Sequence, residues 1–291
     1  MYSPKEIAHN YIATGTAKTK YPVSKMLLLG ILAGMFIGLA GVGATIVPST
    51  VYGTSLSSIG KLLGAMVFPT GLVMVLLAGS ELFTGNCLII IPVLQKEVKV
   101  QAMLRNWLFV YIGNFIGSII VAAIAVYGGT FTLFSGAAAQ TVIDTAVMKV
   151  TMPWSDALLR GIFCNFLVCV AVWISFAAKD IGGRVIALFF PIMLFVVSGY
   201  EHSIANMYFI PAGIFAKNNI DYTLRYISDH GSASLDSLTW GAMFLRNLIP
   251  STLGNIIGGT GMVGIVYWFV YLREKPEDKQ VKKNSKKKKR K

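Results

Sequence analysis

The chain of 291 residues is 55% hydrophobic and only 13% charged, and its mean hydropathy is +0.64. A soluble domain carries roughly 25% charged residues, so this composition excludes a soluble globular protein and predicts an all-α polytopic membrane protein. The net charge of +13 comes largely from eight cations within residues 282–291, and nothing else in the chain indicates nucleic-acid binding.

The two ends of the chain differ from the apolar part between them. Residues 1–25 are polar and lack the charged-then-apolar pattern of a cleaved signal peptide. We therefore expect an N-terminal segment over 1–25, a transmembrane domain over 26–273 and a disordered basic tail over 274–291. Such a tail is most simply solvated, and beside a membrane it can also contact anionic lipid head groups.

Six apolar segments are long enough, alone or in two pieces, to cross a bilayer, which takes about 20 residues. The first covers residues 26–47, where glycines spaced four apart predict close packing against a neighbouring helix. The others are expected at about 58–79, 107–127, 157–177, 185–215 and 241–272. A longer connection over 128–153 and a loop over 217–238 separate some of them.

Polar residues interrupt the second and fifth apolar segments. The first interruption, residues 80–86, carries Glu81 and precedes a short apolar run over 87–94. The second, residues 199–206, carries Glu201 and His202. Broken backbone at membrane depth is tolerated only where it is buried in protein or lines a water-filled cavity. Ionisable residues there are functional candidates.

The sequence also contains an internal repeat. Gly79-Ser80-Glu81 matches Gly199-Tyr200-Glu201, and the pattern Arg-Asn-x6-Gly-Asn-x-Ile-Gly begins at both Arg105 and Arg246. We expect two three-helix halves, about 26–127 and 157–272, with the second inserted upside down relative to the first. Inverted repeats with broken helices indicate a translocation path, whereas a shared packing motif without transport would not need a Glu at each break.

Loop charges predict the orientation of the chain. The N-terminal segment, residues 96–105, residues 179–184 and the tail are basic. By the positive-inside rule, both termini are cytoplasmic and Lys149 is external, in a plasma (inner) membrane protein.

The polar residues at membrane depth predict the chemistry of the path. We expect Glu81 and Glu201 to accept backbone N–H bonds and fix each break. His202 should face the lumen, because an imidazole can gain or lose a proton near neutral pH, and Thr84 offers a hydroxyl that donates and accepts. Constrictions are expected at apolar side chains, for which the candidates are Phe68, Leu72, Leu82, Phe83, Val168 and Phe195. Bare ions would pass such constrictions poorly, whereas small neutral acids would pass at modest cost. We therefore expect a weak acid that crosses with help from a proton-bearing histidine.

The three cysteines, Cys87, Cys164 and Cys169, lie in apolar segments and have neither zinc nor disulfide-framework spacing. We expect small core side chains, no metal site and no cofactor.

Three motifs together resemble the formate/nitrite transporter family, which includes hydrosulfide channels. They are Gly79-Ser80-Glu81-Leu82-Phe83-Thr84, the run from Gly199 to Met207 with its Glu-His-Ser-Ile-Ala-Asn core, and the run from Asn247 to Gly259. The resemblance covers about residues 5–273. It implies an aquaporin-like fold with six spans and a homopentamer with one pore in each protomer. Because Glu81 stands where formate channels usually have Asp, the first break looks closer to the nitrite and hydrosulfide branches.

The resemblance also implies roles for individual residues. His202 would be the central pore histidine, and Thr84 and Leu82 would belong to a mobile loop. Leu72, Leu82 and Phe195 would form the cytoplasmic constriction, and Phe68, Phe83 and Val168 the external one. Lys149 would attract anions from outside, and Asn165 and Asn255 would line the middle.

These features predict a channel or transporter for formate, nitrite or hydrosulfide, with His202 exchanging a proton or a hydrogen bond with the anion. An alternative is a neutral-solute pore for water or glycerol, against which the central histidine and Lys149 argue. An intramembrane enzyme using Glu201 and His202 as an acid–base pair would need a nucleophile or metal ligands that the sequence does not supply. We therefore expect no enzymatic activity.

Overall fold

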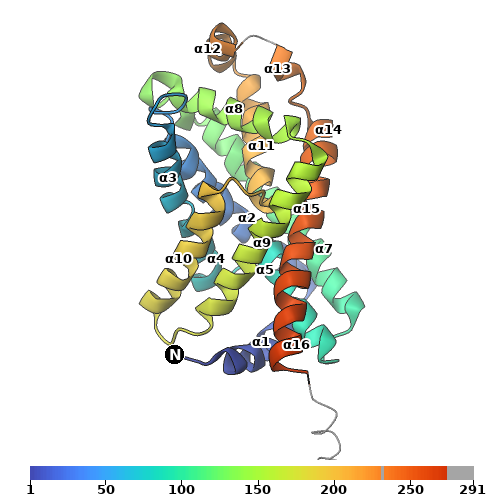
Figure 1. Ribbon diagram of the computed structural model, residues 1–291. Coiled ribbons are helices and arrows are strands. Elements are labelled where there is room, and N and C mark those ends of the chain that lie inside the picture. Colours follow the sequence, from blue (N-terminus) through green and yellow to red (C-terminus); the bar gives the residue numbers. More distant parts are fainter. Residues whose placement is uncertain (231–232, 274–291) are drawn as a thin grey trace, which may run out of the picture.

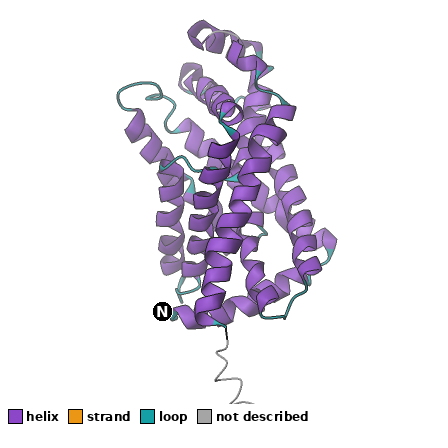
Figure 2. Ribbon diagram, turned by 45° about the vertical axis from the view of Figure 1, so that its right-hand side comes forward, coloured by secondary structure: helices purple, strands orange, loops and turns teal. Residues whose placement is uncertain are grey.

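The computed structural model describes residues 1–230 and 233–273, and every regular element within them is a helix (Figures 1 and 2). Five helical stretches are long and apolar enough to cross a membrane: Val23–Ile46, Ser57–Leu77, Val100–Tyr127, Trp154–Ser175 and Trp240–Tyr271. The remaining predicted span, the fifth in chain order, consists of two helices with a break between them. The all-α prediction is confirmed, and the predicted tail over 274–291 lies outside the described residues.

The first half begins with a short helix, α1 (Pro4–Thr19), and Ser3 and Glu6 form a capping box at its N-terminus. The long helix α2 (Val23–Ile46) follows. The second span comprises α3 (Ser57–Val67), α4 (Pro69–Leu77), the break, and the short helices α5 (Phe83–Asn86), η1 (Cys87–Ile89) and α6 (Ile90–Leu94). The half ends with α7 (Val100–Tyr127), which begins several residues earlier than predicted.

The second half has the same order of elements. After the short turns η2 (Thr130–Thr132) and η3 (Phe134–Gly136) come α8 (Ala137–Thr151) and α9 (Trp154–Ser175). The broken span is α10 (Ile181–Val197) and α11 (Ser203–Lys217). Two further helices, α12 (Ile220–His230) and α13 (Ala233–Asp236), lie in the predicted loop. The last span runs through α14 (Trp240–Ala242), η4 (Met243–Leu248), α15 (Ile249–Ile256), η5 (Ile257–Ile265) and α16 (Val266–Tyr271), with π-helical turns in η4 and η5.

Part of the segment predicted as a connection over 128–153 is instead the helix α8. Ala138, Val142, Ala146 and Lys149 recur at helical spacing and are all buried, so α8 packs one face onto the bundle. It occupies in the second half the place that α1 has in the first. A sequence signal for this match exists, because Lys-x3-Pro-x-Ser occurs at both Lys18 and Lys149.

The two halves run in opposite directions. In Figure 1, α1 and α16 lie at one end of the bundle, and α8 and α14 lie at the other. The first half therefore enters the bundle at the α1 end, and the second enters at the α8 end. This arrangement agrees with the inverted repeat inferred from the sequence.

Glycines allow the first and third spans of each half to pack closely. A Cβ at Gly117 of α7 would clash with the Ile31 carbonyl oxygen of α2, and a Cβ at Gly258 of η5 would clash with the Ile162 carbonyl oxygen of α9. These two glycines end the repeated Gly-Asn-x-Ile-Gly motif. The motif therefore encodes close helix contact.

We expect Gly258→Ala to destabilise the protein by about 1–3 kcal/mol, because the added methyl group must push α9 and η5 apart. Thermal unfolding in detergent measures this change. Gly261→Ala is the matched control, since a Cβ at Gly261 meets no atom within 4 Å. Equal melting temperatures for the two variants would contradict the close-contact interpretation.

Candidate functional site

The two helix breaks meet inside the bundle. Gly79 and Gly199 adopt left-handed backbone conformations at φ 81° and 70°, which end α4 and α10. After each turn the chain crosses an extended residue, Leu82 or His202, and re-enters a helix. The Thr84 hydroxyl from one break then lies 3.0 Å from His202 Nε2 of the other. Both side chains are buried.

Hydrogen bonding defines the tautomer of His202. Its Nδ1 accepts the backbone N–H of Ala205 at 3.0 Å and so caps the N-terminus of α11. An Nδ1 that accepts a hydrogen bond carries no proton, so in the neutral ring Nε2 bears the hydrogen. His202 therefore donates to Thr84, and the Thr84 hydroxyl keeps its own proton to donate elsewhere.

Asparagines from the third span of each half hold the breaks in place. Asn114 Oδ1 accepts the Phe83 N–H at 3.0 Å, and its Nδ2 donates to the Glu81 carbonyl at 2.9 Å. Asn255 does the same in the second half, accepting from Ser203 N–H and donating to the Glu201 carbonyl, each at 2.9 Å. Asn114 was not predicted as a site residue, although the repeated Gly-Asn pair contains it.

The expectation that Glu81 and Glu201 accept backbone N–H groups is wrong. Each carboxylate instead pairs with a lysine from the short helix that precedes its half. Glu81 accepts from Lys18 of α1 at 2.8 Å, and Glu201 accepts from Lys149 of α8 at 2.9 and 3.2 Å. Asparagines satisfy the remaining lone pairs, so that a buried carboxylate is both paired and hydrogen-bonded. In the first half Asn86 donates to Glu81 and also to the amide oxygen of Asn106, and in the second half Asn206 and Asn247 both donate to Glu201.

Lys149 therefore does not stand free at the surface. Only 8% of the residue is exposed, and its charge is compensated by Glu201. Lys18, its counterpart, was not predicted at all. The Lys-x3-Pro-x-Ser repeat could have identified it.

Asn165 joins the two breaks to the helix framework. Its Nδ2 donates to the Thr84 carbonyl at 3.2 Å and to the Asn255 carbonyl at 2.7 Å. Asn255 also donates to the Gly161 carbonyl at 2.8 Å. Both amides, which were predicted to line the middle of the path, bond to the protein backbone: Asn165 holds the Thr84 carbonyl, and Asn255 holds the second break.

Two cavities approach the Thr84–His202 pair from opposite ends of the bundle. One, the Lys149 vestibule, has a volume of about 380 Å³ and reaches His202. The other, the Lys18 vestibule, has a volume of about 360 Å³. A smaller cavity of about 60 Å³, lined by Leu72 and Leu82, shares Lys18 and Ser80 with the second vestibule and extends it toward the breaks.

The predicted constriction residues separate into different surroundings. Phe68 and Phe195 line the Lys149 vestibule and contact each other edge to face at 5.7 Å, and Phe195 stacks on His202 at 5.8 Å. Leu72 and Leu82 lie on the Lys18 side. The expected grouping of Phe195 with these two leucines therefore does not match its contacts.

The other two predicted constriction residues line neither vestibule. Phe83 packs between Trp107 and Tyr111 at ring distances of 5.8 and 4.9 Å and faces an apolar groove beside α7. Val168 is buried in α9.

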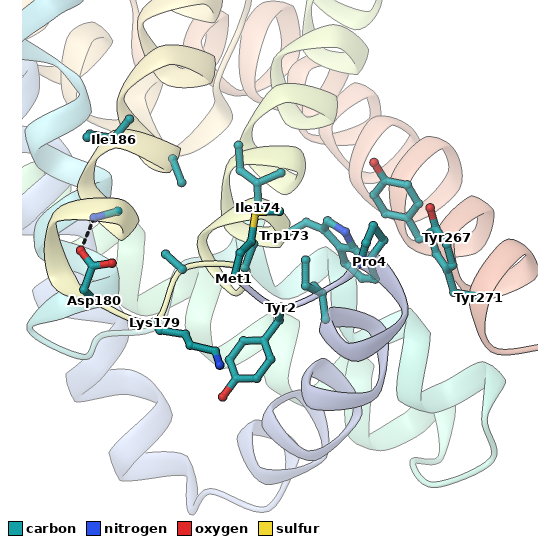
Figure 3. A pocket seen from close by; sticks show the side chains of 15 residues that line it. Met1, Tyr2, Pro4, Trp173, Ile174, Lys179, Asp180, Ile186, Tyr267 and Tyr271 are labelled. Atoms are coloured by element: carbon teal, nitrogen blue, oxygen red, sulfur yellow. Dashed lines mark hydrogen bonds between the residues drawn. The ribbon is translucent and has the colours of Figure 1, made fainter.

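A fourth cavity, of about 600 Å³, lies away from the breaks (Figure 3). It lies between the N-terminal residues, the end of α9 and α16, and aromatic side chains, including Trp173 and Tyr267, surround it. Lys179 lies over the Tyr2 ring at 4.9 Å. This cavity is larger than either vestibule but does not reach the breaks, so cavity volume alone does not identify the transport path.

A metal site needs several His, Cys, Asp or Glu side chains close together. Among the described residues, no group of three or more His, Cys, Asp or Glu side chains could hold a metal ion. Cys87, Cys164 and Cys169 are buried, as expected of core side chains.

Comparison with known proteins identifies the family. A family model described as formate/nitrite transporter matches residues 5–269. A probable formate transporter of Methanothermobacter thermautotrophicus is 38% identical over 94% of this chain and 98% of its own length. The formate channel FocA of Escherichia coli is 35% identical over 88% of this chain and 89% of its own length.

Solved structures agree with this assignment. A pentameric formate channel with formate bound has a TM-score of 0.77 and 35% identity, and covers 86% of this chain and 98% of its own. An FNT family ion channel has a TM-score of 0.77 at 25% identity, covering 91% of this chain and 98% of its own. The chain thus belongs to the formate/nitrite transporter family.

Proposed function

We propose that this protein carries formate, and with it small monovalent anions such as nitrite and hydrosulfide, across the plasma membrane. The observation that carries the proposal is the Thr84–His202 hydrogen bond, 3.0 Å long, between two vestibules that each contain lysine. The relatives named as formate transporters or channels support the choice of formate.

In the proposed path, the anion gives up water at the apolar side chains and receives hydrogen bonds from protein donors instead. Phe68 and Phe195 narrow the path on one side, and Leu72 and Leu82 on the other. The two donors at the centre are His202 Nε2–H and the Thr84 hydroxyl. A hydrogen bond to a charged group contributes about 1.5–3 kcal/mol, so these donors offset part of the cost of desolvation.

His202 acts in this proposal as a hydrogen-bond donor. If it released its Nε2 proton while Nδ1 still accepted from Ala205, an imidazolate would remain. Delivering a proton would instead require a ring protonated at both nitrogens, which would break the cap of α11. Of the two roles expected from the sequence, this geometry favours hydrogen bonding over complete proton transfer.

The assembly and topology belong to the same proposal. We place both termini in the cytoplasm, with the Lys149 vestibule external, on the loop charges. The similar structure named as a pentameric channel supports a homopentamer with a path in each protomer. Transport makes and breaks no covalent bond, so the proposal includes no enzymatic step.

The test is uptake of formate, nitrite, hydrosulfide and glycerol into proteoliposomes over a pH series. We expect flux of the weak-acid anions that depends on pH and little flux of glycerol. Flux that ignores both pH and charge would indicate a neutral-solute pore instead.

Thr84→Val should lower formate flux by roughly tenfold, because it removes a donor worth about 1.4 kcal/mol while keeping the side-chain volume. Thr84→Ser, which retains the hydroxyl, is the matched control and should keep most of the flux. Equal flux in the valine and serine variants would remove this hydroxyl from the mechanism.

A further inference from the structure

Three cations line the Lys149 vestibule: Lys61, Lys149 and Arg160. They differ in their counter-charges. Lys149 forms a bidentate pair with Glu201, so the pair acts at a distance as a dipole rather than as a unit charge. The cation predicted to attract anions is therefore the one whose charge is compensated.

Lys61 has the opposite surroundings. It is exposed on α3 and has no ion-pair partner in the part of the chain that the structure describes. Its ammonium lies 3.5 Å from where a Cβ of Gly199 would be, which places the charge at the end of α10 beside the break. Arg160 is only weakly compensated, since Asp156 is 4.0 Å away and both side chains are nearly half exposed.

The Lys18 vestibule repeats this arrangement. It contains the Lys18–Glu81 pair and two further cations, Lys25 and Arg184. Lys25 lies over the Tyr21 ring at 3.9 Å, and neither further cation has an ion-pair partner among residues 1–230 and 233–273. Each mouth thus has one lysine–glutamate pair with a buried carboxylate and two cations outside it.

We propose that Lys61, assisted by Arg160, is the anion-capture site of the Lys149 vestibule, and that Lys149 instead serves to neutralise Glu201. The ligand is a small monovalent oxyanion or carboxylate. An uncompensated charge at the mouth of a cleft with low-dielectric walls raises the local concentration of counter-ions, whereas a compensated pair does so weakly. The inference deepens the proposed function by assigning the capture step of the same path.

A thiol-labelling experiment measures the potential in this vestibule without relying on transport. Met148 lines the vestibule and is 53% exposed, so Met148→Cys provides a reporter thiol, while the three native cysteines are buried. The rate of reaction with an anionic methanethiosulfonate reagent is divided by the rate with a cationic one of similar size. In the reporter background, Lys61→Gln should lower this ratio by about fourfold at low ionic strength, and added salt should reduce the difference.

Arg246→Gln is the matched control. Arg246 is exposed near the same end of the bundle but lines neither vestibule, so the same loss of one charge should leave the ratio close to that of the reporter protein. An unchanged ratio in Lys61→Gln, or an equal fall in Arg246→Gln, would overturn the capture site.

Formate uptake separates this proposal from the proposed function. Lys61→Gln should raise the half-saturating formate concentration several-fold at low salt and leave the maximal rate unchanged, because it alters capture and not the central donors. A lowered labelling ratio together with no formate uptake by the wild type would support the capture site and overturn formate transport. Normal formate uptake by the wild type together with an unchanged labelling ratio in Lys61→Gln would support formate transport and overturn the capture site.

Discussion

Lys149→Met is expected to destabilise the protein by about 3–5 kcal/mol, because it leaves the Glu201 carboxylate buried without its counter-charge. Glu201 is 3% exposed, and after loss of the lysine its remaining donors among the described residues would be the Asn206 and Asn247 amides. Asn247 also donates to the Lys149 backbone carbonyl, so a shift of α8 would disturb a second bond of the cluster. The melting temperature in detergent, together with the yield of folded protein, measures the effect.

Two further variants separate the buried pair from the loss of a positive charge. Lys61→Met removes an exposed cation from the same vestibule and should change the melting temperature little. Lys149→Met combined with Glu201→Gln removes both charges and should recover much of the lost stability, since a neutral amide costs less to bury than an unpaired carboxylate. Equal stability of Lys149→Met and Lys61→Met would show that the Lys149–Glu201 pair contributes nothing to the fold.

The apolar spans and the two breaks could be predicted from the sequence because local composition determines them. About 20 apolar residues are required wherever a helix crosses a bilayer, and a polar, glycine-containing interruption ends a helix whatever lies around it. Gly79 and Gly199 were thus found where the backbone turns left-handed. The glycines spaced four apart in the first span likewise predicted close packing before any partner helix was known, and Gly30 and Gly34 do lie against the backbone of α7.

The partners of the buried charges could not be predicted in the same way. Lys18 and Glu81 are far apart in the chain, as are Lys149 and Glu201, and only the packing of α1 and α8 onto the bundle brings them together. Backbone N–H groups at a break are the nearest donors in sequence, which is why they were assigned to the glutamates. In the fold, Asn114 and Asn255 reach those N–H groups first.

The helix α8 was missed for a physical reason as well. Its buried face contains Thr141 and Lys149 besides alanine, valine and isoleucine, and its other positions include Gln140 and Asp144, so its mean hydropathy falls well below that of a spanning segment. Hydropathy detects helices that face lipid on most sides. A helix that lies across one end of a bundle has to be found by periodicity or by the Lys-x3-Pro-x-Ser repeat.

Replacing His202 is expected to lower formate flux by about tenfold or more, because the variant loses the Nε2–H that faces Thr84 at the centre of the path. Two substitutions divide the functions of the ring. His202→Phe keeps an aromatic ring to stack on Phe195 but loses the acceptor that caps α11. His202→Asn provides a good capping side chain but has no ring and does not reach Thr84 as the imidazole does.

If the donor is what matters, both variants should lose flux, although only His202→Phe should lose the cap, which contributes about 1 kcal/mol of stability. Flux into proteoliposomes and the melting temperature would be measured on the same preparations, with size-exclusion chromatography to confirm assembly. Wild-type flux in His202→Asn would mean that this position serves the helix cap alone. Because the capping bond occupies Nδ1 and the bond to Thr84 uses Nε2, each ring nitrogen has a separate role, and a neutral residue that reproduces only one of them should not restore transport.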